Sequence, residues 1–288
     1  MLQAPSSKLQ AAATTGVRTT WELEAAFFDR EAERQAQILH PVDPLTIKRY
    51  ASSSPRRRFR EEFRFRVLRD LRGKNVLDVG CGDGQNSVLL AKLGALVTGI
   101  DISPKSIELA QKKAEISGVK NAARFICSPV EKAEIPPHSF DVIWGDAILH
   151  HLIENLELIL AQLIRWAKPG AIMIFSEPAN FNDTLRRLRF LLPVKTDATP
   201  DERPLEPAEL EIVKRFIPDL RIRFFSLFGR LERFILTNHN YERSPLWRRA
   251  LSNILHVLDF ALLSLPIIRN MGGQAVFYGH APKSGTLQ

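Results

Sequence analysis

The sequence predicts an α/β fold in which a mostly parallel, doubly wound sheet carries helices on both faces. In the segment 74–103, a short apolar run, a glycine-rich turn, a helix and a second apolar run follow one another. Strands are then expected at Ala123–Cys127, Asp141–Trp144 and Ala171–Ser176, with a helix at Leu156–Trp166 before the last of them. Because two parallel strands need a crossover connection, this alternation is typical of successive β-α-β units.

The N-terminal part predicts a leader and then a helical region. Residues 1–20 contain no apolar run of the length of a secretory signal, and we expect a disordered leader, with an organelle transit peptide as the alternative. Residues 21–72 are expected to contain an amphipathic helix at Trp21–Leu39, a helical turn at Ile47–Tyr50 within a loop, and a basic helix at Pro55–Leu71.

The basic helix combines an apolar face with many arginines. Apolar side chains recur at four-residue steps, at Phe59, Phe63, Val67 and Leu71. The arginines on the remaining surface could contact nucleic acid, a membrane or an anionic substrate. We favour the plainer interpretation of a solvated helix packed on the sheet, in which Glu61 and Glu62 pair with part of the arginines.

The turn after the first strand, 75–79, is rich in glycine. Gly80, Gly82 and Gly84 stand at alternate positions, and a backbone without Cβ atoms lets a ligand approach closely. A dinucleotide fingerprint would need another glycine at the position of Gln85. The turn therefore departs from the pattern that binds NAD.

Acidic residues around this turn narrow the choice of ligand. Asp101 ends the second strand about 20 positions after the first glycine, where a carboxylate can accept hydrogen bonds from ribose hydroxyls. Asp78 and Asp83 would repel a pyrophosphate, which prefers bare backbone N–H groups. A nucleoside with an ammonium and a sulfonium group suits them better, so the turn favours S-adenosylmethionine as the cofactor.

Four motifs in this order resemble those of the class I S-adenosylmethionine-dependent methyltransferases, above all the small-molecule group that includes ubiquinone and menaquinone methyltransferases. They are V-L-D-V-G-C-G-D-G and G-I-D-I-S around the turn, then F-D-V-I-W-G-D-A-I-L-H-H-L (Phe140–Leu152) and A-K-P-G-A-I-M-I-F (Ala167–Phe175). The resemblance covers about 71–178. It implies a Rossmann-like sheet of seven strands, closed by an antiparallel hairpin, and a helical lid formed by residues 21–72.

The resemblance also implies which residues meet the cofactor. These are Asp78, Gly80, Cys81, Gly82, Gly84, Asp101, Ile102, Ser128 and Asp146. Where the family has an aspartate for the adenine amine, this chain has Pro129, and we expect backbone groups of Cys127 and Ser128 to replace it. Tyr50, in the lid, is the candidate for the acceptor pocket, with an ordinary half-buried tyrosine as the alternative.

Polar residues that follow the fourth and fifth strands are the candidates for catalysis, because ligands bind outside the carboxyl ends of an open parallel sheet. His151 is the first choice of general base, since imidazole titrates near neutrality. His150 and Glu177 are further candidates, and packing in the pocket wall is the alternative. No Asp, Glu or His cluster has metal-ligand spacing, so no metal is expected.

The C-terminal part is expected to complete the sheet, with strands at Arg221–Leu227 and Ala275–Tyr278. The chain would then divide into a cofactor-binding domain at 73–228, an insertion at 229–273, and a last strand with its tail at 274–288.

The insertion contains the apolar stretch Leu246–Ile268. Asp259 and Pro266 interrupt it, and it is too short to span a bilayer comfortably. We favour packing on the core or a lid over the acceptor pocket. Contact with a membrane interface or with a second copy, as a homodimer, is the alternative.

The composition indicates in which compartment the protein works and which kinds of partner it binds. Among the 288 residues there are two cysteines, too few for a disulfide framework, and this fits a reducing cytoplasm, with peripheral membrane association left open. The net charge of +8 implies an anionic partner or surface.

The sequence therefore predicts an enzyme, an S-adenosylmethionine-dependent methyltransferase that acts on a small hydrophobic or amphiphilic acceptor, lipid-, isoprenoid- or quinone-like. An RNA or protein methyltransferase is one alternative. It is disfavoured, together with a nucleic-acid partner, because no N/D-P-P-Y/F motif follows the fourth strand. A non-catalytic, membrane-associated module that binds S-adenosylmethionine is the other alternative.

Overall fold

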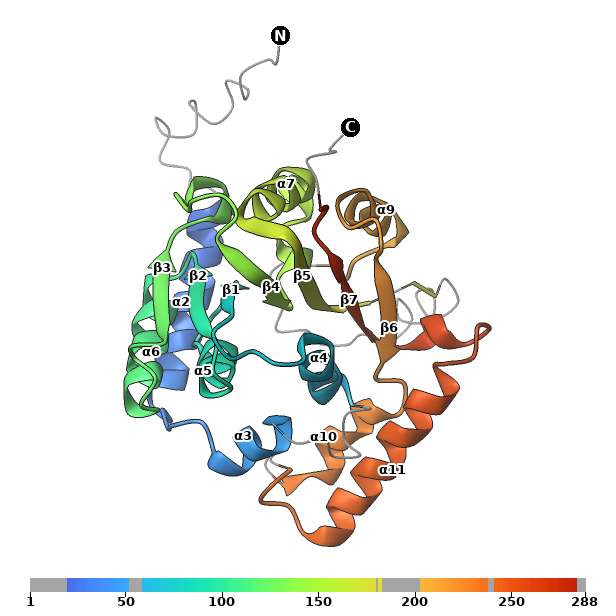
Figure 1. The fold of residues 1–288 in the computed structure, drawn as a ribbon. Helices are drawn as coiled ribbons and strands as arrows, with labels where there is room; N and C mark the ends of the chain where they lie inside the picture. The colour runs from blue at the N-terminus through green and yellow to red at the C-terminus, as the bar shows by residue number, and fades with distance from the viewer. Residues whose placement is uncertain (1–19, 52–58, 180, 183–202, 238–240, 284–288) are drawn as a thin grey trace.

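The structure, a computed structural model, describes residues 20–51, 59–179, 181–182, 203–237 and 241–283. Nearly all of the expected leader and the start of the expected basic helix lie outside these residues. The described part contains a seven-stranded sheet with helices on both faces, which confirms the α/β, Rossmann-like doubly wound arrangement (Figure 1).

The strands lie in the order β3-β2-β1-β4-β5-β7-β6. Their bounds are β1 Asn75–Val79, β2 Leu96–Asp101, β3 Ala123–Cys127, β4 Phe140–Asp146, β5 Ala167–Pro178, β6 Arg221–Phe225 and β7 Gln274–His280. Pairing is parallel from β3 through β5, whereas β7 is antiparallel to both β5 and β6. The mostly parallel sheet is therefore closed at one side by an antiparallel pair, as the resemblance implied.

Three of the described α-helices precede β1, four connect successive strands between β1 and β6, and two lie between β6 and β7. Their bounds are α2 Thr20–Ala36, α3 Pro44–Ala51, α4 Arg60–Leu68, α5 Gln85–Lys92, α6 Pro104–Ile116, α7 Leu156–Trp166, α9 Pro207–Phe216, α10 Glu232–Ile235 and α11 Leu246–Leu262. In Figure 1, α3, α4, α10 and α11 gather below the edge where the parallel strands end.

The core has two layers because successive strand residues point to opposite faces. Leu77 and Ile143 face the layer that α7 and α9 complete. Val76 and Trp144 belong to the other layer, with residues of α4 and α5. A sheet that is buried on both faces explains why its strands read as continuous apolar runs.

Several boundaries differ from the expectation: the helix expected to continue to Leu71 ends at Leu68, and the strand expected to continue to Leu227 ends at Phe225. The segment expected to hold a helical turn forms a full helix, α3. β5 starts at Ala167, which pairs with Phe140 before the register shifts, so the expected turn into the fifth strand belongs to the strand itself. The division of the chain into lid, cofactor-binding domain and insertion stays a prediction.

Candidate functional site

The turn between β1 and α5 has a backbone shape that glycine adopts easily. Gly80, Gly82 and Gly84 have positive φ angles of 66°, 50° and 77°. The N–H groups of Gly80 and Cys81 donate to the carbonyl oxygen of Ile100, at 2.9 and 3.1 Å, and hold the turn against β2. A Cβ added at Gly82 would meet nothing within 4 Å, so this part of the backbone faces open space.

The carboxylate of Asp101 is oriented by backbone donors at the end of β2. Its Oδ2 accepts from the N–H of Gly82 at 2.8 Å, and its Oδ1 accepts from the N–H of Ser103 at 2.9 Å. Burial raises the pKa of Asp101, and these backbone hydrogen bonds oppose the rise. Each oxygen can still accept another bond, which suits a pair of ribose hydroxyls. Ile102 follows in a half-buried position.

Asp78 lies buried beneath the glycine turn, with 1% of its surface exposed. The hydroxyl of Ser87 donates to its Oδ2 at 2.6 Å and thereby ties β1 to α5. Burial raises the pKa of Asp78 to about 7. Both protonation states of this carboxyl are therefore populated near neutral pH.

Two expected cofactor residues are engaged elsewhere. The thiol of Cys81 is buried against β2, where a Cβ on Gly99 would lie 2.8 Å from its sulfur. The N–H of Ser128 donates to the carbonyl of Asp101 at 2.9 Å, and its hydroxyl donates to the carbonyl of Pro129 at 2.9 Å. The N–H of Ser128 thus extends the pairing of β3 with β2, and the expected contact of the Cys127 and Ser128 backbone with the adenine stays a prediction.

The N-terminal helix α2 reaches this edge of the sheet. Asp29 accepts from the hydroxyl of Ser103 at 2.6 Å and from the N–H of Lys105 at 3.1 Å, so it caps α6 beside Asp101. Sequence reasoning missed Asp29, because an acidic residue on an amphipathic helix ordinarily faces water and nothing in the local pattern marks this one.

Glu177, at the end of β5, anchors the loop that follows β4. Its Oε1 accepts from the N–H groups of Ile148 and Leu149 at 3.1 and 2.9 Å, and its Oε2 lies 2.8 Å from Nδ1 of His150. Glu177 is fully buried and His150 is 5% exposed. The structure thus brings two of the expected catalytic residues together, but as a buried pair that holds the loop.

His151, in the same loop, is half-buried. Its ring lies 4.2 Å from that of His150, and 5.5 Å from the ring of Phe28 on α2, which meets it edge to face. It is more exposed than the other two expected catalytic residues, His150 and Glu177, which are both buried. Among the described residues, no set of three or more His, Cys, Asp or Glu side chains could hold a metal ion.

Asp146, at the end of β4, forms a bidentate ion pair with Arg64. Nη1 of Arg64 lies 3.0 Å from Oδ1, and Nη2 lies 3.1 Å from Oδ2, which also accepts from Nδ2 of Asn86 at 3.1 Å. The guanidinium lies 4.2 Å from the centre of the Trp144 ring and also pairs with Glu61. Burial acts to raise the pKa of Asp146, but the charge of Arg64 outweighs it and the pKa lies below its usual value.

Arg64 corrects the expectation that the arginines of the basic helix form a solvated face, because this one is 0% exposed. α4 is covered on more than one side: Phe63 packs against Phe225, and Phe65 packs against Trp144. The four-residue spacing correctly predicted the buried side of the helix that carries Phe63, but it did not predict the second buried side, which carries Arg64 and Phe65.

A cavity of about 1130 Å³ opens beside Asp146. α3, α4 and the start of α5 line one side of it, and α10 and α11 line the other. Aromatic residues such as Tyr50, Phe59 and Tyr241 alternate in its wall with arginines and glutamates. Tyr50 therefore lies where an acceptor pocket was expected, whereas the three expected catalytic residues are not part of the wall.

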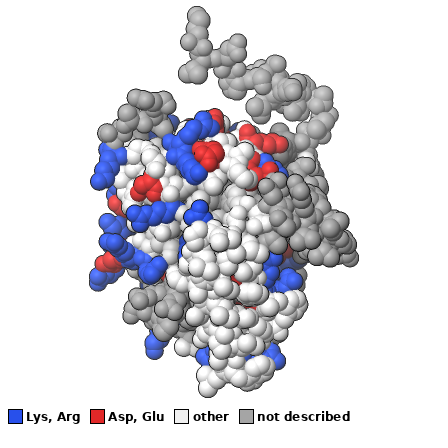
Figure 2. Space-filling model, turned by 90° about the vertical axis from the view of Figure 1, so that its right-hand side faces the viewer, with Lys and Arg blue, Asp and Glu red and all other residues white. Residues whose placement is uncertain are grey.

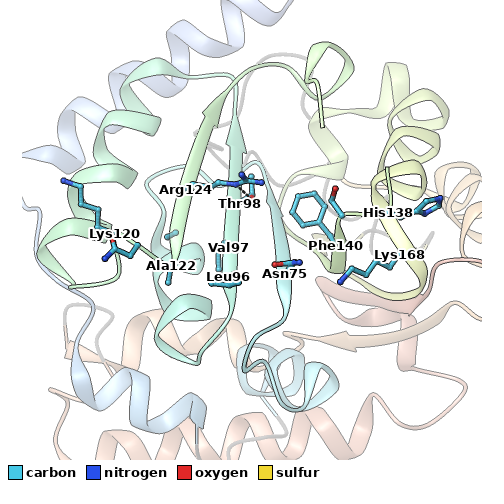
Figure 3. Close-up of a pocket in the computed structure, with 13 residues that line it drawn as sticks. Asn75, Leu96, Val97, Thr98, Lys120, Ala122, Arg124, His138, Phe140 and Lys168 are labelled. Atoms are coloured by element: carbon cyan, nitrogen blue, oxygen red, sulfur yellow. Dashed lines mark hydrogen bonds between the residues drawn. The ribbon is translucent and has the colours of Figure 1, made fainter. Parts of the chain in front are cut away.

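A smaller pocket of about 590 Å³ lies near the amino ends of the parallel strands (Figure 3). Asn75 and Phe140 line it, as do Thr98 and Arg124, whose Nε donates to the Thr98 hydroxyl at 2.8 Å. Because open α/β sheets bind their ligands outside the carboxyl ends of the strands, we assign the candidate site to the opposite edge, with the glycine turn.

Sequence comparisons agree with this geometry. A family model described as a methyltransferase domain matches residues 70–203. The ubiquinone biosynthesis O-methyltransferase of Neisseria meningitidis serogroup C is 34% identical over 202 residues, which are 66% of this chain and 78% of the relative. The mitochondrial ubiquinone biosynthesis O-methyltransferase of Schizosaccharomyces pombe is 37% identical over 113 residues, 39% of this chain and 40% of that relative.

A solved structure shares the fold. Phosphoethanolamine N-methyltransferase 1 of Haemonchus contortus, in complex with phosphoethanolamine and S-adenosylhomocysteine, matches 97% of this chain and 52% of its own, with a TM-score of 0.55 and 14% identity. At that identity the likeness concerns the fold alone.

Proposed function

Because this chain belongs to the class I S-adenosylmethionine-dependent methyltransferases, we propose that it methylates a hydroxyl oxygen on a small hydrophobic or amphiphilic acceptor of the quinone kind. The chain is a methyltransferase, and S-adenosylmethionine is its cofactor. The observation that carries the choice of acceptor is the 34% identity to a ubiquinone biosynthesis O-methyltransferase over 78% of that relative. Lipid- and isoprenoid-like acceptors fall within the same proposal.

The residues around the glycine turn fit this cofactor, which supplies an electrophilic methyl group on a sulfonium when it is bound. Asp101 would accept hydrogen bonds from the ribose with the lone pairs that its backbone donors leave free. Ile102 would lie against the adenine, and the open backbone at Gly82 would border the ligand. An ammonium near Asp78 would favour the ionised form of a carboxyl whose pKa is about 7.

The cavity beside Asp146 would hold the acceptor. Its volume of about 1130 Å³ exceeds the roughly 300–1,000 Å³ of ordinary small-molecule sites and leaves room for an apolar tail. The charges in its wall are partly paired: Arg49 lies 3.3 Å from Glu62 and 2.6 Å from Glu242. A wall of paired charges and aromatic rings suits an amphiphilic molecule.

His151 would take the proton of the acceptor hydroxyl. Asp146 is a weaker base because Arg64 holds its pKa below the usual value. His150 and Glu177 would position the loop that carries His151 rather than meet the acceptor, since both are buried. Because His151 is not part of the cavity wall, the reactive end of the acceptor must extend past Asp146 toward this loop.

The test is methyl transfer from labelled S-adenosylmethionine to a short-chain prenylated catechol. We expect labelled product from the wild type, loss of S-adenosylhomocysteine binding in Asp101→Ala, and unchanged binding in the control Asp70→Ala, which alters an exposed carboxylate. His151→Ala should lower turnover with donor affinity unchanged. Product only with RNA or protein would overturn the acceptor, and donor binding without any turnover would leave a non-catalytic module.

We further propose that the protein contacts a membrane peripherally. Within the described residues, no helix has the length and apolarity needed to cross a bilayer. Association of two copies as a homodimer is the alternative that the sequence left open.

A further inference from the structure

Helix α11 turns its apolar side away from the protein. The apolar side chains that follow one another on its outer surface are Leu246, Trp247, Leu251, Ile254, Val257 and Leu258, which we call the apolar face. Trp247 is 63% exposed and Ile254 is 55% exposed. Phe234 on α10 and Ile267 after α11 are also exposed, at 71% and 91%. Contiguous apolar surface of this kind is unfavourable in water and marks an interaction site.

The polar side of α11 holds the helix in this orientation. The carboxylate of Asp259, which is 2% exposed, accepts from the N–H groups of Leu227, Phe228 and Gly229 at 2.9, 2.7 and 2.8 Å. On the same side, His256 pairs with Glu232 and lines the cavity. The apolar stretch was expected to pack on the core, and for the apolar face this expectation is wrong because the face is exposed. Turning the helix to bury it would pull Asp259 and His256 away from their partners.

Arginines surround the apolar face. Figure 2 shows a broad area without charged side chains, with Lys and Arg side chains at its margins. Arg248 lies over the ring of Trp247 at 5.0 Å, and Arg233 lies over the ring of Phe234 at 4.6 Å. Arg243 and Arg269 are exposed before and after the helix. The sole acidic residue between 243 and 283 is the buried Asp259.

We propose that α11 lies in the interface of a membrane that carries anionic lipids, with the apolar face toward the acyl chains and the arginines toward the phosphates. An amphipathic helix with aromatic and apolar residues on one side and arginines at its border binds such interfaces. A second copy fits less well. An isologous dimer would bring the same arginine margin against itself, whereas anionic head groups neutralise it.

This orientation would place the cavity at the membrane surface. Glu232 and Arg233 of α10, together with His256 of α11, line the cavity, while the opposite side of α11 carries the apolar face. The helix is about 25 Å long and would lie between the cavity and the lipid surface. An acceptor dissolved in the bilayer could then enter without crossing water; this step rests on the proposed function, whereas the docking itself does not.

The experiment is co-sedimentation of the purified chain with phosphatidylcholine vesicles, with and without phosphatidylglycerol. We expect binding to the anionic vesicles, weakened by added salt. The double variant Ile254→Glu/Leu258→Glu should lower the bound fraction on the order of tenfold, since it places two charges in the apolar face. The variant Arg243→Gln/Arg269→Gln should lower binding to anionic vesicles alone, also on the order of tenfold.

The matched control is Leu158→Glu, which alters an apolar residue on α7 that is 59% exposed and far along the chain from the insertion. All variants should bind S-adenosylhomocysteine as the wild type does, which shows that they fold and keeps the docking test separate from the proposed activity. Vesicle binding that Ile254→Glu/Leu258→Glu leaves unchanged would overturn the proposal. So would a dimer in solution that this variant dissociates, because that result assigns the face to a second copy.

Discussion

Replacing Arg64 by methionine tests whether the ion pair with Asp146 organises the site. The substitution keeps an unbranched side chain of similar length but removes the guanidinium that lies over Trp144, donates to Oδ2 of Asp146 and lies 3.0 Å from its Oδ1. Asp146 would keep its hydrogen bond from Asn86 and lose its cation. We expect the variant to fold with a weakened connection between α4 and the end of β4.

The expected loss in the free energy of unfolding depends on how deeply each member of the ion pair is buried. Arg64 is 0% exposed, whereas the side chain of Asp146 is 23% exposed and borders the cavity, so water can replace part of the bonds that Asp146 loses. Removing one member of a fully buried pair costs about 3–5 kcal/mol, whereas an exposed pair contributes about 0–1 kcal/mol. Because Asp146 lies between these cases, we expect Arg64→Met to lower the free energy of unfolding by about 1–3 kcal/mol. Removing both charges restores much of that loss, so the double variant Arg64→Met/Asp146→Asn should be more stable than Arg64→Met alone.

Urea unfolding at neutral pH measures the difference, with Arg72→Met as the matched control. Arg72 pairs with Asp70 at the surface, where both side chains are mostly exposed, so that variant should unfold close to the wild type. If Arg64→Met unfolded at the same urea concentration as Arg72→Met, the pair would not be buried as described. If the double variant were no more stable than Arg64→Met, the penalty would not come from the unpaired carboxylate.

Three further predictions concern the glycine turn and the loop after β4. Burial raises the pKa of Asp78 from 3.8 to about 7, so the folded chain holds a proton that the unfolded chain has lost between these values. Stability should therefore fall as the pH rises through this range, and Asp78→Asn should flatten the fall in thermal unfolding between pH 5 and pH 8. Gly84→Ala places a Cβ 2.7 Å from that of Ala110 at a φ of +77°, whereas Gly118→Ala meets nothing within 4 Å at a φ of +70°. Chemical denaturation should show a loss of about 1–2 kcal/mol for Gly118→Ala and about 1–3 kcal/mol more for Gly84→Ala, and equal losses would contradict the close packing of α5 on α6. Glu177→Gln should lower kcat about tenfold or more with donor affinity unchanged, because His151 would lose its positioned loop; an unchanged kcat would refute that role.

Sequence patterns correctly predicted those structural features that depend on residues close together in the chain. The strand Ala123–Cys127 and the helix Leu156–Trp166 have the bounds that the apolar spacing indicated. The glycine turn was recognisable because its positive φ angles favour glycine whatever the tertiary context. These features could be predicted because the physical cause lies within about one turn of chain.

Features that depend on distant partners could not be predicted. Arg64 finds Asp146 across 82 positions, and Asp29 finds Ser103 across 74. Each side chain is ordinary in its own helix, and its role is decided by which strand end the fold brings beside it. The engagement of the Ser128 N–H is similar, since it follows from the register of β3 against β2.

The orientation of α11 shows why periodicity alone misleads here. A helix with one apolar and one polar side satisfies the same spacing whether it faces the core or turns away from it. The deciding residue is Asp259, whose carboxylate takes three backbone N–H groups of the loop 227–229 out of water. Burying that carboxylate without those donors would cost several kcal/mol, whereas exposing single apolar side chains costs less for each of them. A buried acid in an apolar stretch is therefore a reason to ask which donors it meets before assigning the stretch to the core, and in this chain those donors leave the apolar face exposed.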